Sequence, residues 1–203
     1  MIEIIRGWQT QVLESLVRSN PNLGLDQRAE FMVSLFEKDL PEHSRILDIG
    51  GRWGFYAGPL EKRGHHPVIL DVVRPQLQKA PVVIYNGRVM PFPDKSFDAS
   101  LLITVLHHIE DVDQVLKEAR RVTRGRVIVV EDLYLHPVDR FWTILRDRLY
   151  NFEWFGHPCG FKTRLQWEHY FETLGFKVQS CREVFTRLCG LRILNGLFVL
   201  EVA

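Results

Sequence analysis

The chain has 203 residues, 46% of them hydrophobic, and its 26 Lys and Arg against 25 Asp and Glu leave a formal net charge of +1. A chain of this length can bury a sizeable core as one domain, whereas the even charge argues against a nucleic-acid-binding protein. No apolar run approaches the roughly 18 residues of a membrane-spanning helix, and acidic residues interrupt the N-terminal segment where a secretory signal would be apolar, so we expect a globular cytoplasmic protein.

Residues 1–43 predict a helical cap of two helices separated by Pro21, with the second one stopped by Pro41. The second helix is expected to begin near Asp26, a residue type that caps helix N-termini well. The apolar face of the first helix comprises Ile5, Trp8, Val12 and Leu16, and that of the second comprises Ala29, Met32, Val33, Phe36 and Leu40.

Residues 44–132 alternate short apolar runs with helical patterns. Runs this uniformly apolar are typical of parallel strands that helices cover on both faces. Val112–Val122 predicts a helix, with Gly125 as the residue that stops it. The pattern predicts an α/β doubly wound, Rossmann-like sheet with right-handed crossovers. Its expected strands cover residues 45–48, 67–71, 81–85, 99–104 and 126–130.

The last third of the chain begins with an aromatic segment over residues 133–162. Thr163 and Gln166 then form a capping box for a helix that ends at Gly175. Two strands over 176–184 and 193–202 are too close in sequence for a crossover helix, so we expect an antiparallel pair at the sheet edge. We therefore predict one domain over 1–203, with a mostly parallel seven-stranded sheet, an antiparallel last strand, and four parts: 1–43, 44–132, 133–162 and 163–203.

The glycine-rich segment Leu47-Asp-Ile-Gly-Gly-Arg-Trp-Gly54 follows the first expected strand and opens a helix that runs to about Gly64. Glycines permit a tight turn and a close approach of the backbone to a ligand. Asp71 ends the second strand, 21 residues after Gly50, where a carboxylate can accept hydrogen bonds from ribose hydroxyls. The pair predicts a nucleoside-containing ligand; the structural alternative is a tight turn followed by a solvated Asp.

Several ordered motifs resemble the class I S-adenosylmethionine-dependent methyltransferases, specifically the methyltransferase type 11 group. The loop of that family, D-x-G-x-G-x-G, aligns with residues 48–54, and its L-P-F-P-D-x-S-F-D motif is similar to residues 90–98. Residues 102–109 and 125–131 are similar to the family's segments around its fourth and fifth strands.

The resemblance implies S-adenosylmethionine as the cofactor, with Asp48 and Gly50 along its methionine portion, Asp71 on the ribose and Val72 against the adenine. Asn86 stands where the family usually has Asp, and its side-chain oxygen can still accept a hydrogen bond from the adenine amino group. Thr104 falls at the amino-acid end of the cofactor. The full implied set is Asp48, Gly50, Gly51, Arg52, Gly54, Asp71, Val72, Asn86, Gly87 and Thr104.

Arg52 is the main departure, because the family has glycine there and a positive φ costs a non-glycine residue roughly 1 kcal/mol or more. Its guanidinium either reaches the cofactor carboxylate or fills the pocket. These outcomes favour different functions, a methyltransferase in one case and a degenerate binding or regulatory module in the other. A nicotinamide-dependent dehydrogenase fits less well, because residues 50–54 lack the G-x-G-x-x-G spacing.

His107 and Glu131 are weak candidates for a catalytic base, since both follow central strands at the expected acceptor crevice; for Glu131 a solvated strand end is the alternative. No metal site is expected: Cys159, Cys181 and Cys189 cannot all pair, lack metal-ligand spacing and are interpreted as reduced thiols. The aromatic segment is interpreted as core packing, as a lid over an apolar or aromatic acceptor, or as a peripheral membrane contact. The predicted function is methyl transfer to a small-molecule acceptor.

Overall fold

The computed structural model describes residues 24–74, 80–151, 158–188 and 190–202, together with Ser15 and Ser19. The expected first helix, with Ile5, Trp8, Val12 and Leu16, lies outside these residues, as does Cys189. Within them, neither Cys159 nor Cys181 belongs to a disulfide.

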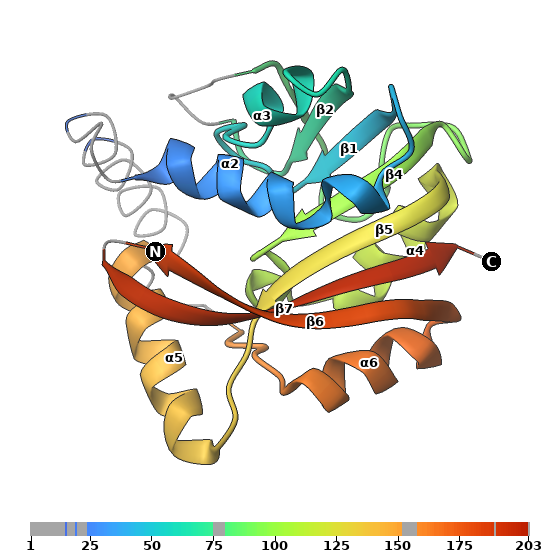
Figure 1. The fold of residues 1–203 in the computed structure, drawn as a ribbon. Coiled ribbons are helices and arrows are strands. Elements are labelled where there is room, and N and C mark those ends of the chain that lie inside the picture. The colour runs from blue at the N-terminus through green and yellow to red at the C-terminus, as the bar shows by residue number, and fades with distance from the viewer. Residues whose placement is uncertain are drawn as a thin grey trace.

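A seven-stranded sheet with the order β3-β2-β1-β4-β5-β7-β6 forms the centre of the fold (Figure 1). The pairs among β1 to β5 are parallel, and β7 is antiparallel to both β5 and β6. The predicted doubly wound, mostly parallel sheet with an antiparallel last strand is thereby confirmed. Its strands are β1 (Arg45–Ile49), β2 (His66–Asp71), β3 (Val82–Ile84), β4 (Phe97–Ile103), β5 (Thr123–Asp132), β6 (Phe176–Leu188) and β7 (Leu191–Val202).

Helices cover both faces of the sheet, because the strands are apolar on both sides. On one face, α2 (Leu25–Phe36) buries Met32, Val33 and Phe36 against residues of β1, β4, β5 and β7. On the other, α4 (Val112–Val122) and α6 (Arg164–Thr173) bury a separate cluster that includes Leu116, Trp167 and Phe171. The side-chain cap of Asp111 on Gln114 N begins α4, and the predicted capping box of Thr163 and Gln166 begins α6.

Three helix boundaries differ from the sequence predictions. Gly24, at φ 73°, is the N-cap of α2 without a side-chain hydrogen bond, and Asp26 lies in the first turn, where a carboxylate still favours the helix dipole. The glycine loop leads through turns into α3 (Ala57–Glu61) rather than directly into a long helix. Gly125 lies within β5, and α4 passes into that strand without a glycine stop, since Thr123 is already extended. A Cβ on Gly125 would lie 2.6 Å from Asp98 O, so the glycine permits close strand packing instead.

The segment after β5 forms α5 (Pro137–Asn151), which lies beside the carboxyl ends of the parallel strands (Figure 1). The hairpin of β6 and β7 reaches the same region, where Tyr150 Oη donates a hydrogen bond to Leu188 O. Both final strands are longer than predicted, because their pairing continues to Leu188 and Leu191. No helix among the described residues is both long and apolar enough to cross a membrane.

Candidate functional site

A cavity of about 860 Å³ opens at the carboxyl ends of the parallel strands, where a doubly wound sheet places its ligands. The loop after β1 and the ends of β2 and β4 line one part of it, and α5 lines another. Eight of the ten residues that the resemblance implies for the cofactor line this cavity: Gly50, Gly51, Arg52, Asp71, Val72, Asn86, Gly87 and Thr104.

The two glycines at the start of the loop are required by crowding. Gly50 has φ 74°, and a Cβ on it would lie 2.4 Å from Val105 Cγ2. A Cβ on Gly51 would lie 2.2 Å from the Oδ2 atom of Asp48. These contacts bring the loop backbone against the strand ends and leave its outer surface to line the cavity.

Asp48 and Gly54 do not line the cavity. Gly54 packs the loop against β2, since a Cβ there would lie 2.5 Å from Ile69 Cδ1. Asp48 lies beneath Gly51, is 1% exposed, and its Oδ2 atom has no hydrogen-bond partner. Burial and the nearby charge of Asp71 raise the pKa of Asp48 to about 7. A buried carboxylate without a partner is costly, and positive charge bound at the loop would relieve it.

Asp71 holds the loop at the edge of the cavity. Its Oδ2 atom accepts a hydrogen bond from Arg52 N at 2.9 Å, and its Oδ1 atom accepts one from Val73 N at 3.0 Å. The residue is 9% exposed, so the alternative of a solvated Asp does not fit. Burial raises the pKa of Asp71, and its backbone hydrogen bonds act against that shift.

Arg52 adopts φ 42°, the left-handed conformation expected at a glycine position. Its guanidinium carbon lies 4.6 Å from the centroid of the Trp53 ring, so the side chain stacks on its neighbour. Because the cavity is present with Arg52 in place, this side chain does not fill the pocket.

Two further implied cofactor residues have special local geometry. Asn86 Oδ1 accepts hydrogen bonds from Arg88 N and Val89 N. This oxygen therefore fixes the turn through Gly87. Thr104 has φ 50°, an uncommon conformation for a β-branched residue, and Thr104 N donates to Val130 O at 2.7 Å. This strain turns the chain sharply after β4 and sends the next residues along the cavity.

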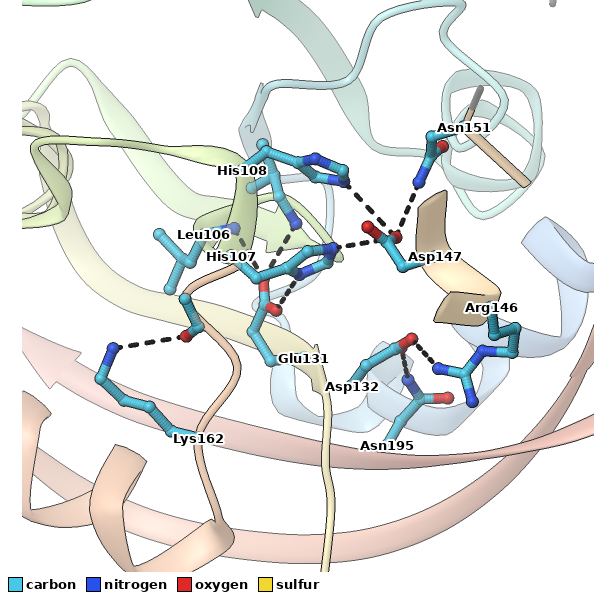
Figure 2. Close-up of polar contacts among 12 residues, drawn as sticks. Leu106, His107, His108, Glu131, Asp132, Arg146, Asp147, Asn151, Lys162 and Asn195 are labelled. Carbon is cyan, nitrogen blue, oxygen red and sulfur yellow. Dashed lines mark hydrogen bonds and ion pairs between the residues drawn. The ribbon is translucent and has the colours of Figure 1, made fainter. Parts of the chain in front are cut away.

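His107 and Glu131 are brought together in the interior. His107 Nδ1 lies 2.5 Å from Glu131 Oε2, and Glu131 Oε1 accepts hydrogen bonds from Val105 N and Leu106 N (Figure 2). Glu131 is fully buried, which excludes the solvated strand end, and it does not line the cavity. Its geometry favours a role in positioning His107 over a role as a base.

The electrostatic environment keeps a proton on His107. Burial lowers the pKa of His107, but the carboxylates of Glu131 and Asp147 outweigh that effect and raise it to about 10. An imidazolium has no lone pair with which to accept a proton. Without a change in this cluster, the geometry therefore does not favour His107 as a general base.

The polar face of α5 was missed by the sequence analysis. Asp147 is 7% exposed, and its Oδ1 atom accepts a hydrogen bond from Asn151 Nδ2 at 2.7 Å and lies 3.4 Å from His107 Nε2. Arg146 Nη2 lies 2.5 Å from Asp132 Oδ2, and both residues line the cavity with Asp147, Tyr150 and Asn151. The available signal was the spacing of Thr143, Asp147 and Asn151 at four residues, which places polar side chains on one helix face.

The apolar side chains of α5 point the other way. Phe141 is 61% exposed and Trp142 is 60% exposed, whereas Thr143 and Asp147 are the buried residues of this helix. The interpretation of these aromatics as core packing is therefore wrong. Phe141 and Trp142 also give no reason to expect an aromatic acceptor, because neither residue lines the cavity. Phe152, Trp154 and Phe155 of the same segment lie outside the described residues.

Residues 47–130 match a family model described as a methyltransferase domain. An uncharacterized methyltransferase of Mycobacterium sp. (strain KMS) is 27% identical over 124 residues, which cover 55% of this chain and 49% of that protein. A demethylmenaquinone methyltransferase of Corynebacterium efficiens is 32% identical over 100 residues, which cover 46% of this chain and 44% of that protein. The chain thus spans about half the length of the curated relatives it matches.

Solved structures with the same fold cover nearly the whole chain. A SAM-dependent methyltransferase from Thermotoga maritima, described as a possible histamine N-methyltransferase, superposes with a TM-score of 0.69 at 16% identity, covering 96% of this chain and 100% of that one. A SAM-dependent methyltransferase from Aquifex aeolicus has a TM-score of 0.65 at 17% identity, covering 94% and 98%. At these identities the likeness establishes the fold.

Proposed function

We propose that this chain, whose residues 47–130 match a methyltransferase-domain family model, transfers a methyl group from S-adenosylmethionine to a small-molecule acceptor in the cavity beside α5. The observation that carries the proposal is the continuity of this cavity. The glycine loop and Asp71 line it together with His108, Asp147 and Asn151, so cofactor and acceptor can share one continuous space.

The residues present fit the cofactor. The glycine loop presents backbone to the cavity, and Asp71 places a carboxylate where two ribose hydroxyls can donate to it. Asp48 is buried beneath the loop, and its Oδ2 atom has no hydrogen-bond partner, so a positively charged ligand bound at the loop would favour its ionised form. Arg52 supplies a cation at the cavity wall, and a carboxylate group is its natural partner.

The bound cofactor supplies an activated methyl group on a positively charged sulfur. The chain then has to align the acceptor atom with that methyl group and exclude water, which lowers the barrier by fixing reactants in place. Helix α5 performs both tasks in this proposal. It is held over the strand ends by the ion pair of Arg146 with Asp132 and by the contact of Asp147 with His107.

The lining of the cavity supports an acceptor with a polar group. Where α5 borders the cavity, His108, Arg146, Asp147 and Asn151 are all polar, whereas Leu188 and Ile193 supply apolar surface at the β6–β7 hairpin. A hydroxyl or amine facing the polar residues and an apolar portion facing the hairpin would satisfy both.

The test is calorimetric titration with S-adenosylmethionine, S-adenosylhomocysteine and NAD. We expect micromolar binding of the first two and no binding of NAD. An absence of binding by all three would contradict the enzyme and support the degenerate module. The matched control is Glu42→Ala, an exposed residue away from the cavity, which should leave the dissociation constants unchanged.

A further inference from the structure

Two consecutive histidines and an aspartate meet where η3 (Leu106–His108) faces α5. One ligand-type atom from each of His107, His108 and Asp147 lies within 4.8 Å of the others. In Figure 2, nitrogens of both histidines point to one carboxylate oxygen of Asp147. No metal site was expected from the cysteine spacing. Asp147 lies about 40 residues from the histidines, and only the fold brings it to them.

The distances from Asp147 to the two imidazoles are close to those between ligands of a common ion. Asp147 Oδ1 lies 3.4 Å from His107 Nε2 and 3.9 Å from His108 Nε2. Charge-assisted N–H···O bonds are shorter, about 2.7–2.9 Å. Zinc bonds of about 2.0–2.2 Å to nitrogen and oxygen place two tetrahedral ligands roughly 3.3–3.6 Å apart. A small rotation of His108, which is partly exposed to the cavity, would complete the set.

Glu131 supports this arrangement from behind. It accepts from His107 Nδ1 at 2.5 Å and is itself fixed by the amides of Val105 and Leu106, so Nε2 of His107 is directed toward Asp147. A carboxylate that holds the far nitrogen of a ligating histidine is a regular feature of metal sites, where it sets the ring orientation and raises ligand basicity.

The charge of the cluster also favours a cation. Glu131 and Asp147 are two buried carboxylates facing the same imidazole. Arg146, which directly precedes Asp147 on α5, contacts Asp132 at 2.5 Å. Buried carboxylates need compensating positive charge. A protonated His107 supplies one such charge, and a divalent ion that displaces its Nε2 proton would supply two on the side of the cavity.

We propose that His107, His108 and Asp147 bind a divalent first-row transition metal, with Glu131 as the carboxylate that orients His107. The ion takes the place of the Nε2 proton of His107, which leaves to solvent. Two imidazoles and one carboxylate form a ligand set that suits zinc, iron or manganese and leaves coordination positions open. Resting on the proposed function, an open position facing the cavity would take an oxygen of the methyl acceptor and orient it.

The experiment starts from full-length protein freed of metal by chelation and checked by elemental analysis. Titration with zinc chloride should show one equivalent bound in the micromolar range or tighter. Asp147→Asn and His108→Asn should each weaken binding at least tenfold. The matched control, Asp139→Asn, changes an acid on the same helix that does not belong to the cluster and should bind zinc like the unmodified protein.

Binding of cobalt in place of zinc tests whether a cysteine is among the ligands. The test is needed because Cys159, which is not in a disulfide, lies in the chain segment near His107. The cobalt spectrum should lack a thiolate charge-transfer band, and Cys159→Ser should leave it unchanged. Failure to bind one equivalent, binding insensitive to both Asp147→Asn and His108→Asn, or loss of binding in Cys159→Ser would each overturn the proposal.

S-adenosylhomocysteine is titrated into the same metal-free preparations, which separates the two proposals. Retained nucleoside binding without metal binding refutes the metal site alone. Retained metal binding without nucleoside binding refutes the proposed methyl transfer alone and leaves the cation site supported.

Discussion

Glu131 Oε2 and His107 Nδ1 lie 2.5 Å apart, and both side chains are almost completely buried. The contact joins the end of β5 to the turn after β4, and the second oxygen of Glu131 accepts from Val105 N and Leu106 N. One carboxylate therefore fixes the backbone of the turn and the orientation of its first histidine. Phe161 stacks on the other side of that ring, with centroids 4.3 Å apart.

Replacing Glu131 by Gln tests this relationship. The amide keeps the shape and can accept from the two backbone amides, but it removes the charge that faces His107. Breaking a buried charge pair costs about 3–5 kcal/mol, so we expect the free energy of unfolding in urea to fall by about 3 kcal/mol. Glu110→Gln, at an exposed position in the next loop, should change it by less than about 0.5 kcal/mol. Equal small effects of both substitutions would show that the pair contributes little.

Asp71→Ala removes the carboxylate that we assign to the ribose hydroxyls. Charge-assisted hydrogen bonds contribute about 1.5–3 kcal/mol, so the dissociation constant for S-adenosylhomocysteine should rise roughly 10- to 150-fold. Asp71→Asn retains one acceptor oxygen and should show an intermediate loss, which separates the ribose contact from the support that Asp71 gives to Arg52 N and Val73 N. Unchanged affinity in both variants would place the ribose elsewhere.

Arg52→Gly addresses the departure from the family pattern. Relief of the left-handed conformation at φ 42° stabilises the fold by about 1–2 kcal/mol, and the added freedom of the unfolded chain offsets about 0.4–1 kcal/mol of that. A net gain of about 0.5–1 kcal/mol in the free energy of unfolding is expected. Lys95→Gly, at φ 53° in an exposed turn, should give a similar gain.

The same Arg52 variant reports on the cofactor. Loss of a partly exposed cation beside a bound carboxylate costs about 0.2–1 kcal/mol, so S-adenosylhomocysteine should bind roughly two- to fivefold more weakly, while Lys95→Gly leaves the affinity unchanged. Tighter binding to Arg52→Gly would mean that the guanidinium obstructs the site.

The sheet could be predicted because its strands are apolar over their whole length and separated by clear turns. The register of the strands and the boundaries of the elements were harder to predict from the sequence. Gly125 is a residue type that often ends a helix, yet pairing with β4 makes β5 begin before it, at Thr123. The close contact with Asp98 O explains why this residue is a glycine. Local sequence does not contain this contact, which joins segments 27 residues apart.

The part of the cavity that the glycine loop lines could be predicted because loop geometry fixes its residues. The part beside α5 could not, since Asp147 and Asn151 reach the cavity only after α5 is placed over the strand ends. The aromatic residues in the same helix gave the stronger pattern and suggested the wrong inner face. Asp48 was expected in the cavity, whereas the crowding of Gly51 puts it one layer beneath.

Asp48→Asn tests the buried carboxylate through its pH dependence. The pKa of Asp48 is raised from 3.8 to about 7, so between these values the folded protein holds a proton that the unfolded chain releases. The free energy of unfolding therefore falls as the pH rises through this window. Asparagine does not ionise, so the variant should equal the unmodified protein near pH 4 and exceed it at pH 8 by up to about 4 kcal/mol. A difference independent of pH would show that Asp48 does not titrate in this range.

Paired substitutions on α5 and α6 test which tryptophan belongs to the core. Trp167 on α6 is 0% exposed and stacks on Phe171 with centroids 5.4 Å apart, so Trp167→Ala should lower the free energy of unfolding by about 3–5 kcal/mol. Trp142 on α5 is 60% exposed, and Trp142→Ser should change it by no more than about 0.5 kcal/mol in urea unfolding. Because Thr143 and Asp147 are the buried residues of α5, losing the exposed tryptophan leaves the contact of Asp147 with His107 in place. A loss above 2 kcal/mol in Trp142→Ser would mean that this face packs against the protein, and α5 would then be part of the core rather than a cover for the cavity.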